Sequence, residues 1–321
     1  MQVRKPTPRR GVPRVVEFHS GGLLLRGYLY DQPSVSVPIS RPAVVMTHGF
    51  SATATGMVAD RYAQVIHAAG LTVLLFDGPC LGMSDGEPRG TLNRWTQLRA
   101  YRDALDFVAA LPSVDASRLA VWGDSMSGAT AIGVAAFDDR VRAVAVQVPA
   151  CGRTLPPDDP DGAAFAMLRD IYHSDTLPAV RDRRGPMAVV SPDPSTMPSL
   201  LEPITAFRWF IDYGGHAGTG WQNQATLEVP DTPVVFHAGL CAPHLASASL
   251  WVVAEDDEMP GAASDVSLDA FGTAPEPKQL LLIEGGHFGL LYDHSSTFER
   301  ASTAQAEFLA RHVQADIGAS P

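Results

Sequence analysis

Short, continuous runs of apolar residues recur along this chain, and they limit the folds that it can adopt. The first runs span residues 43–50, 71–79, 119–125 and 141–149. Two more, at residues 248–257 and 278–287, follow after a long gap. Runs of this length without polar alternation are typical of strands buried on both faces, as in a parallel sheet. We therefore expect a mainly parallel sheet built from these segments.

Helical patterns separate these runs, as the crossover connections of a parallel sheet require. Apolar residues recur at a helical spacing over residues 95–111, and residues 57–69 can supply a second crossover helix. Within residues 15–30, β-rich stretches on either side of Gly21-Gly22 indicate an antiparallel hairpin. The expected fold class is α/β, with a doubly wound and mainly parallel sheet that an antiparallel hairpin precedes.

The long gap, residues 151–230, differs in composition from the rest of the chain. It is rich in Pro, Gly and Asp, but it contains a helical pattern at 163–172 and an aromatic stretch at 207–213. So long an insertion with its own helices is better interpreted as a lid than as a loop. We expect residues 1–150 and 231–321 to form the core domain and residues 151–230 to form the lid. The large apolar residues of the lid are expected to divide between its own core and the wall of an apolar pocket; they are Phe165, Met167, Ile171, Tyr172, Phe207, Trp209, Phe210 and Tyr213.

Charge and hydropathy exclude several classes of protein. The formal net charge of −11 opposes binding to phosphate backbones, so nucleic acid is not an expected partner. Because no run of about 18 apolar residues occurs, we expect no membrane-spanning helix and no membrane partner. The basic N-terminal segment is not followed by an apolar one, so we expect no signal peptide and a cytoplasmic location; its basic residues are Arg4, Lys5, Arg9 and Arg10. A small molecule is the expected partner, and a homo-oligomer is compatible with the sequence.

The stretch "VWGDSMSGAT", residues 121–130, is the first candidate for chemistry. It joins an apolar strand to an Ala-rich helix and reads glycine, any residue, serine, any residue, and then Ser127 where a second glycine is usual. In this setting such a turn exposes a serine hydroxyl at a sharp strand-to-helix corner, which makes Ser125 a candidate nucleophile. Ser127 is a mild departure, with Gly128 relieving the next position. Taken alone, the pattern favours a Gly/Ser turn without chemistry, and a phosphate loop is disfavoured because no lysine follows Gly128 and the glycine spacing is wrong.

A serine nucleophile needs a base to take its proton and an acid to orient that base, and the chain offers both after later strands. His287 follows one apolar run, and Asp256 and Asp257 follow another. The order serine, acid, histidine, each at a strand end, is the order of catalytic triads on doubly wound sheets. We predict the triad Ser125, Asp257 and His287. Asp257 lies three residues after Ala254, the expected strand end, whereas counting back four residues from Pro260 selects Asp256.

A fourth element of this site is a pair of backbone N–H groups. A tetrahedral oxyanion needs donors that are already in place where the negative charge develops. We expect one from Met126, the residue after the nucleophile, and the other from Phe50, which ends the segment "VVMTHGF". His48 in the same segment is expected to shape the loop and to take no part in proton transfer.

These segments, taken in order, resemble the α/β-hydrolase superfamily over nearly the whole chain. The resemblance rests on the hairpin and on "THGF", "FDGPCLGMSDGEP", "VDASRLAVWGDSMSG", "AEDDEMP" and "GGHFG". Within the superfamily, the chain resembles the dienelactone-hydrolase-like and X-prolyl-peptidase-like serine esterases. The resemblance implies the α/β-hydrolase fold and a serine hydrolase that cleaves an ester, thioester or lactone through an acyl-enzyme intermediate, without a cofactor. An acyltransferase with the same triad and an organic acceptor remains the alternative, and a non-catalytic ligand-binding scaffold is a third interpretation.

The cysteines and a histidine-rich segment are weaker candidates for a nucleophile or a metal site. Dienelactone hydrolases carry a cysteine at the elbow, where this chain has serine, so we expect Cys80, Cys151 and Cys241 to be inert or to line a pocket. His237 and His244 flank Cys241, but their spacing matches no common zinc motif. We therefore expect no metal site.

Overall fold

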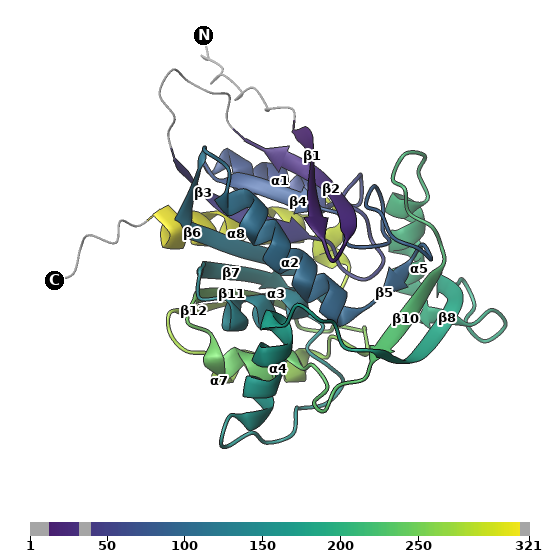
Figure 1. Cartoon of the computed structure of the whole chain (residues 1–321). Coiled ribbons are helices and arrows are strands. Elements are labelled where there is room, and N and C mark those ends of the chain that lie inside the picture. Colours follow the sequence, from purple (N-terminus) through teal and green to yellow (C-terminus); the bar gives the residue numbers. More distant parts are fainter. Residues whose placement is uncertain (1–12, 32–39, 315–321) are drawn as a thin grey trace, which may run out of the picture.

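The computed structural model describes residues 13–31 and 40–314, which form a large sheet, a smaller one and their helices (Figure 1). The basic N-terminal segment, and with it the expectation of no signal peptide, lies outside the described residues. No helix in the part of the chain that the structure describes combines the length and the apolar character needed to cross a membrane.

The main sheet has eight strands in the order β1-β2-β4-β3-β6-β7-β11-β12. They are β1 (Arg14–Ser20), β2 (Leu23–Tyr30), β3 (Arg41–Thr47), β4 (Thr72–Phe76), β6 (Val114–Asp124), β7 (Val141–Gln147), β11 (Ala248–Ala254) and β12 (Lys278–Ile283). The strands β4, β3, β6, β7, β11 and β12 are parallel to one another. Strands β1 and β2 pair in antiparallel fashion, and β2 runs antiparallel to β4. This confirms the predicted fold class and the N-terminal hairpin. Gly21 and Gly22 form its two-residue turn at φ angles of +56° and +84°, which only glycine adopts readily.

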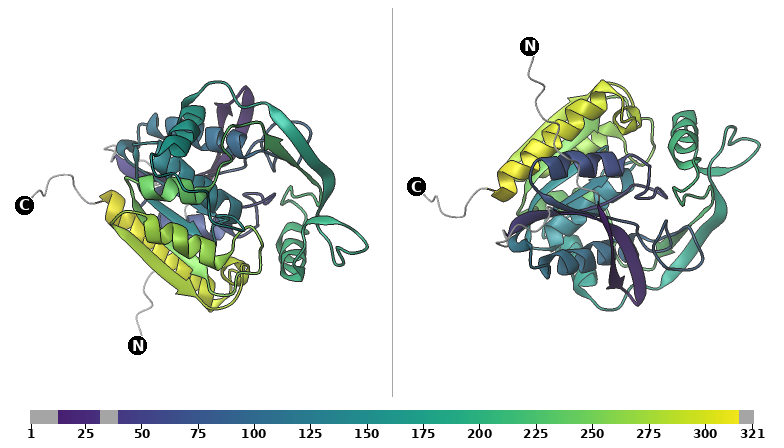
Figure 2. Two further views of the ribbon diagram at one scale, coloured as in Figure 1. Left: turned by 90° about the horizontal axis from the view of Figure 1, so that it is seen from below. Right: turned by 90° about the horizontal axis from the view of Figure 1, so that it is seen from above.

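Helices cover both faces of the main sheet, as Figure 2 shows from two sides. They include α1 (Ala59–Ala68), α2 (Arg94–Ala109), α3 (Ser125–Phe137), α7 (Ser264–Thr273) and α8 (Ser296–Gln314). Helix α1 packs against α8, and α2 packs against α3. The two faces make two separate apolar cores, and adjacent residues of β6 point into different ones: Trp122 into one core and Val121 into the other. A strand buried on both faces has this pattern, which explains the unbroken apolar runs of the sequence.

Residues 151–230 contribute to two places in the molecule. Helix α4 (Ala163–His173) packs against α2 and against α6 (Ala238–Cys241), and its Phe165 and Tyr172 contact Phe137 of α3. The rest of the insertion lies beside the main body and builds most of the second sheet (Figures 1 and 2).

The second sheet has the strand order β5-β10-β8-β9. These strands are β5 (Thr91–Leu92), β8 (Val180–Val190), β9 (Ser199–Leu201) and β10 (Ala225–Pro230). Helix α5 (Ile204–Trp209) follows β9 and continues into a π-helical turn, Phe210–Gly214. Short 3₁₀ turns lie at Ala242–His244 and Gly289–Leu291. The function of this segment as a lid stays a prediction.

Candidate active site

Ser125 lies at the junction of β6 and α3 with a φ angle of +51°, a conformation that costs a residue other than glycine about 1 to 3 kcal/mol. Strand and helix approach each other closely around it. A Cβ atom on Gly123 would lie 2.3 Å from the carbonyl oxygen of Ser127, and one on Gly128 would lie 3.2 Å from Cα of Pro149. Glycine is therefore needed at position 123, where the helix meets the sheet, and a side chain at position 128 would pack tightly against Pro149.

Ser127, which stands where the usual motif has glycine, is buried and ties the corner together. Its hydroxyl accepts a hydrogen bond from the backbone N–H of Asp124 at 3.0 Å. The carbonyl oxygens of Thr47 and Asp124 both lie 2.9 Å from the same hydroxyl, whose single proton can serve one of them at a time. The departure from glycine thus adds a link between the ends of β3 and β6.

Asp257 and His287 are in direct contact. Oδ2 of Asp257 lies 2.8 Å from Nδ1 of His287, and each side chain is only 2% exposed. The other carboxylate oxygen of Asp257 accepts the backbone N–H of Met259 at 2.9 Å. Asp256, the alternative acid, is exposed and does not share this contact. An acceptor at Nδ1 fixes the tautomer that leaves Nε2 free to act as a base.

Glu258 is a further carboxylate at this loop that the sequence reasoning missed. Its Oε2 accepts the backbone N–H of His287 at 2.7 Å, and its Oε1 accepts the hydroxyl of Thr205 on α5. A Cβ on Gly286 would lie 2.2 Å from Oε2, so a side chain there would displace the Glu258 carboxylate from this position. In the sequence, Glu258 belongs to an acidic run that looks like a solvated turn, and nothing there indicates its partners.

Ser125 and His287 both line a small cavity of about 30 Å³ together with His48 and Trp209. This volume suffices for one or two water molecules. Within the described chain no hydrogen bond joins Ser125 to His287 directly. Contacts of this kind are often long in structures without substrate and tighten when it binds.

The two predicted oxyanion donors lie on either side of Ser125. Met126 is in the first turn of α3, where backbone N–H groups have no partner within the helix. Phe50 follows β3, and both residues line the same large cavity as Ser125. A Cβ on Gly49 would lie 3.1 Å from Cβ of Ser125, so the glycine before Phe50 allows the loop to approach the serine.

His48 is buried between two hydrogen-bond acceptors. Its Nδ1 lies 2.9 Å from Oδ2 of Asp124, and its Nε2 contacts the carbonyl oxygen of Met57. The backbone N–H of Gly49 also lies 2.9 Å from Nδ1. Burial disfavours the charged imidazole, but the adjacent Asp124 carboxylate and these hydrogen bonds outweigh it, so the pKa of His48 is raised. With both nitrogens occupied in this way, His48 holds the loop, in agreement with its expected structural role.

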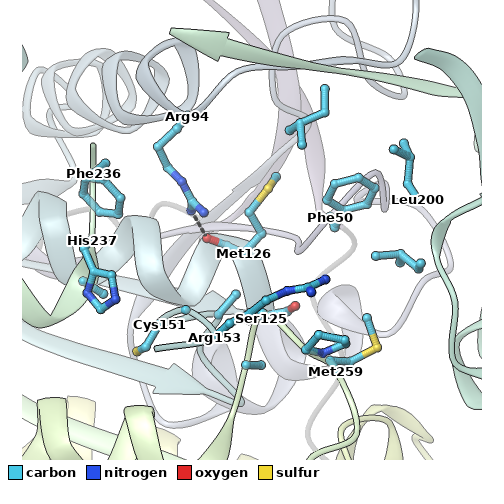
Figure 3. Close-up of a pocket in the computed structure, with 18 of the residues that line it drawn as sticks. Phe50, Arg94, Ser125, Met126, Cys151, Arg153, Leu200, Phe236, His237 and Met259 are labelled. Carbon is cyan, nitrogen blue, oxygen red and sulfur yellow. Dashed lines mark hydrogen bonds between the residues drawn. The ribbon is translucent and has the colours of Figure 1, made fainter. Parts of the chain in front are cut away.

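A cavity of about 410 Å³ opens beside Ser125 (Figure 3). Its walls are largely apolar and come from both the core and the insertion; they include Phe50, Met126, Leu200, Leu201, Leu227, Phe236 and Met259. This size suits a small organic ligand. The insertion lines it through residues 151–153 and through β8, β9 and β10, and not through the aromatic residues singled out in the sequence.

Those apolar residues of the insertion have other positions. Trp209 and Phe210 line the small cavity near His287. Phe165 and Tyr172 are buried in the core, and Met167 is exposed. The remaining ones are partly buried and pack against the two cores; they are Ile171, Phe207 and Tyr213.

Comparison with known proteins decides the family. The thiohydrolase aneE of Aspergillus aculeatus is 31% identical to this chain over 310 residues, which cover 92% of each protein. This chain is an α/β hydrolase. The acetyl xylan esterase (AXE1) family model matches residues 88–152, which contain Ser125.

Two further similarities extend the range of relatives of this hydrolase. The polyketide transferase af380 of Aspergillus fumigatus is 31% identical over 214 residues, 66% of this chain and 63% of that protein. The crystal structure of the α/β hydrolase GrgF from Penicillium sp. superimposes with a TM-score of 0.69 at 23% identity, covering 94% of this chain and 99% of that one. The fold is therefore common to this hydrolase and GrgF.

Arg94, at the start of α2, is a polar group in the large cavity of the hydrolase that the sequence did not reveal. Its Nη1 donates to the carbonyl oxygen of Met126 at 2.5 Å and to Oγ1 of Thr130 at 2.7 Å. Its guanidinium carbon lies 5.2 Å from the centre of the Phe236 ring. Burial lowers the pKa of Arg94 to about 10, so the side chain is still charged at neutral pH.

The cysteines of the hydrolase are all free and buried. Cys151 lines the large cavity, and burial raises its pKa to about 12, so it is a protonated thiol at neutral pH. His237 contacts the carbonyl oxygen of Thr154 at 3.0 Å, and the ring of His244 stacks on Phe165. Among the residues that the structure describes, no group of three or more His, Cys, Asp or Glu side chains is arranged to hold a metal ion.

Proposed function

We propose that this hydrolase cleaves an acyl thioester through a covalent intermediate on Ser125. The observation that carries the proposal is the buried Asp257–His287 pair, with its 2.8 Å contact, at a cavity that Ser125 also lines. Ester, thioester and lactone carbonyls are all chemically suited to such a site. The name thiohydrolase of the relative aneE favours the thioester.

In the proposed reaction, Nε2 of His287 accepts the hydroxyl proton of Ser125 while Oγ attacks the carbonyl carbon. The N–H groups of Phe50 and Met126 stabilise the oxyanion, and Asp257 stabilises the imidazolium. Collapse of the tetrahedral intermediate expels the thiolate, which takes the proton from His287. Water, activated by the same histidine, then releases the free acid from Ser125.

Acyl transfer to an organic acceptor is the second candidate. It is favoured by the relative af380, whose name is polyketide transferase, and by the cavity of about 410 Å³, which has room for more than an acyl chain. The small cavity between Ser125 and His287, which suffices for one or two water molecules, favours hydrolysis.

The test is labelling and turnover of the same preparations. A fluorophosphonate should label wild type at Ser125, as located by mass spectrometry of the digested protein. Ser125→Ala should lose the label and lower kcat for a hexanoyl thioester of N-acetylcysteamine by about 10³-fold or more. Ser195→Ala, at an exposed position that lines neither cavity, is the control serine and should keep the label. Labelling of Ser125→Ala at another residue, or unchanged turnover, would overturn the assignment.

A further inference from the structure

The large cavity contains more positive than negative side chains. Arg94, Arg153 and Arg184 all line it, and Glu202 is its single acidic lining residue. Arg153, Arg184 and Glu202 are exposed, whereas Arg94 is partly buried and contacts the residue next to the nucleophile. A cationic cavity is unexpected in a chain with a net charge of −11. The charge that lies deepest, at Arg94, therefore needs an explanation.

Arg94 has no acidic partner in the part of the chain that the structure describes. None of the ion pairs found there involves it. Two hydrogen bonds occupy its Nη1, and both go to neutral acceptors, Met126 and Thr130. A partly buried guanidinium without a carboxylate is costly, and burial accordingly lowers its pKa.

The remaining donors of Arg94 form one edge of the guanidinium. Nε and Nη2 make no hydrogen bond to any described residue, and this edge presents two parallel N–H groups. Such an edge matches the two oxygens of a carboxylate. Figure 3 shows the side chain at the cavity wall, between Phe236 and Met126. The anchored Nη1 and the ring of Phe236 hold the group in place, so little ordering is needed when an anion binds.

We propose that Arg94 binds a carboxylate on the acyl chain of the substrate, so that the preferred substrates are thioesters of acids with a second carboxyl group. This inference rests on the proposed function, because it places the anion in the cavity that Ser125 shares. The apolar walls strengthen the pair by excluding water. Phe50, Leu200 and Met259 line the same cavity and contact the methylene chain between the two carbonyl carbons.

The test compares a charged and a neutral acyl chain on one uncharged leaving group. The probes are the mono-adipoyl thioester of N-acetylcysteamine and its methyl ester. Wild type should prefer the free carboxylate, and Arg94→Gln should lower the ratio of the two kcat/KM values by about 10-fold or more. Arg184→Gln removes an exposed charge from the same cavity and should change this ratio by less than about 3-fold, because water and salt screen it.

Three outcomes would overturn the proposal. Equal losses on both probes in Arg94→Gln would mean that Arg94 only positions Met126. If Arg184→Gln changes the ratio as much as Arg94→Gln does, the overall charge of the cavity determines the preference for the carboxylated probe. The third outcome concerns the leaving group. If Arg94→Gln lowers kcat/KM more for a coenzyme A thioester of the neutral acyl chain than for the N-acetylcysteamine thioester, the recognised anion is on the leaving group. If Arg94→Gln loses its cooperative melting transition, Arg94→Lys replaces it, since lysine keeps the charge but not the two-donor edge.

A binding measurement separates this inference from the proposed function. Calorimetric titration of Ser125→Ala with the two intact probes needs no turnover. Tighter binding of the carboxylated probe, lost in Ser125→Ala/Arg94→Gln, supports the site at Arg94 even if Ser125 proves not to be the nucleophile. Equal binding of both probes would contradict the inference even if Ser125 is labelled and active.

Discussion

At the scale of single residues, the proposed chemistry depends on one hydrogen bond between Asp257 and His287. Asp257→Asn keeps the size of the side chain but can donate a proton to Nδ1, which favours the wrong tautomer of His287. We expect kcat to fall by about 10⁴-fold, as in other serine triads, while Asp256→Asn, at an exposed position, changes it less than about 3-fold. Steady-state kinetics of both variants on one thioester measure this. If the ranking is reversed, the acid is Asp256, and two small losses would mean that neither aspartate has the role.

The sequence predicts the residues whose roles depend on their place after a strand. Ser125, Asp257 and His287 each follow an apolar run, and chain order is enough to relate them. Glu258 and Arg94 could not be found in this way, because their partners are backbone groups far away in the sequence, at His287 and Met126. No pattern of side chains records such a contact.

At the scale of elements, three segments meet at His48, which follows β3. It joins Asp124, at the end of β6, to Met57, which precedes α1. Trp209 of α5 lies against its ring, with the centroids 5.8 Å apart, and donates its indole N–H to Leu291 beyond His287. The insertion is thus fastened to both loops that border Ser125.

This arrangement predicts how stability depends on pH. Because the pKa of His48 is raised in the folded state, its contribution is fully present below the unfolded value of about 6.5 and is lost as the pH rises through the folded value. His48→Gln should therefore lower the free energy of unfolding by about 3 kcal/mol or more near pH 6, and by less at higher pH. Urea unfolding of wild type and variant across this range measures the difference.

His312 is the matched control for that experiment. Burial and the neighbouring Arg311 lower its pKa, so its effect on stability has the opposite dependence on pH. For His312→Gln, the loss in the free energy of unfolding relative to wild type should not become smaller as the pH rises. A constant difference for His48→Gln at all pH values would mean that the pKa of His48 is the same in the folded and the unfolded protein.

The sequence predicts the elements of the main sheet well and those of the insertion poorly. Strands β3, β4, β6, β7, β11 and β12 are apolar runs, whereas the strand β8 is mostly exposed and rich in arginine, so no apolar pattern marks it. Helix α4 is amphipathic, but amphipathicity does not say which surface covers the apolar face. In the structure that surface is the core of the main body and not the insertion.

At the scale of the whole molecule, the strand order places the site. From β3 the chain moves to β4 on one side and then crosses to β6 on the other, and ligands of open α/β sheets bind at such a reversal, beyond the carboxyl ends of the strands. Ser125 follows β6 and Phe50 follows β3, so both lie at this point. The second sheet supplies another wall of the large cavity through β8, β9 and β10.

The two cavities at Ser125 bear on whether its acyl group, in the proposed reaction, is passed to water or to an organic acceptor. In the proposed mechanism both reactions share the acyl intermediate, and they differ only in which nucleophile His287 activates. The small cavity at Ser125 and His287 favours water, and we expect hydrolysis to dominate. Product partition from one thioester, with alcohols and amines added at millimolar concentration, measures this. Acceptors should then compete only in proportion to their concentration and intrinsic reactivity. Saturable transfer to one acceptor, with free acid as a minor product, would instead establish a transferase and make the large cavity its acceptor site.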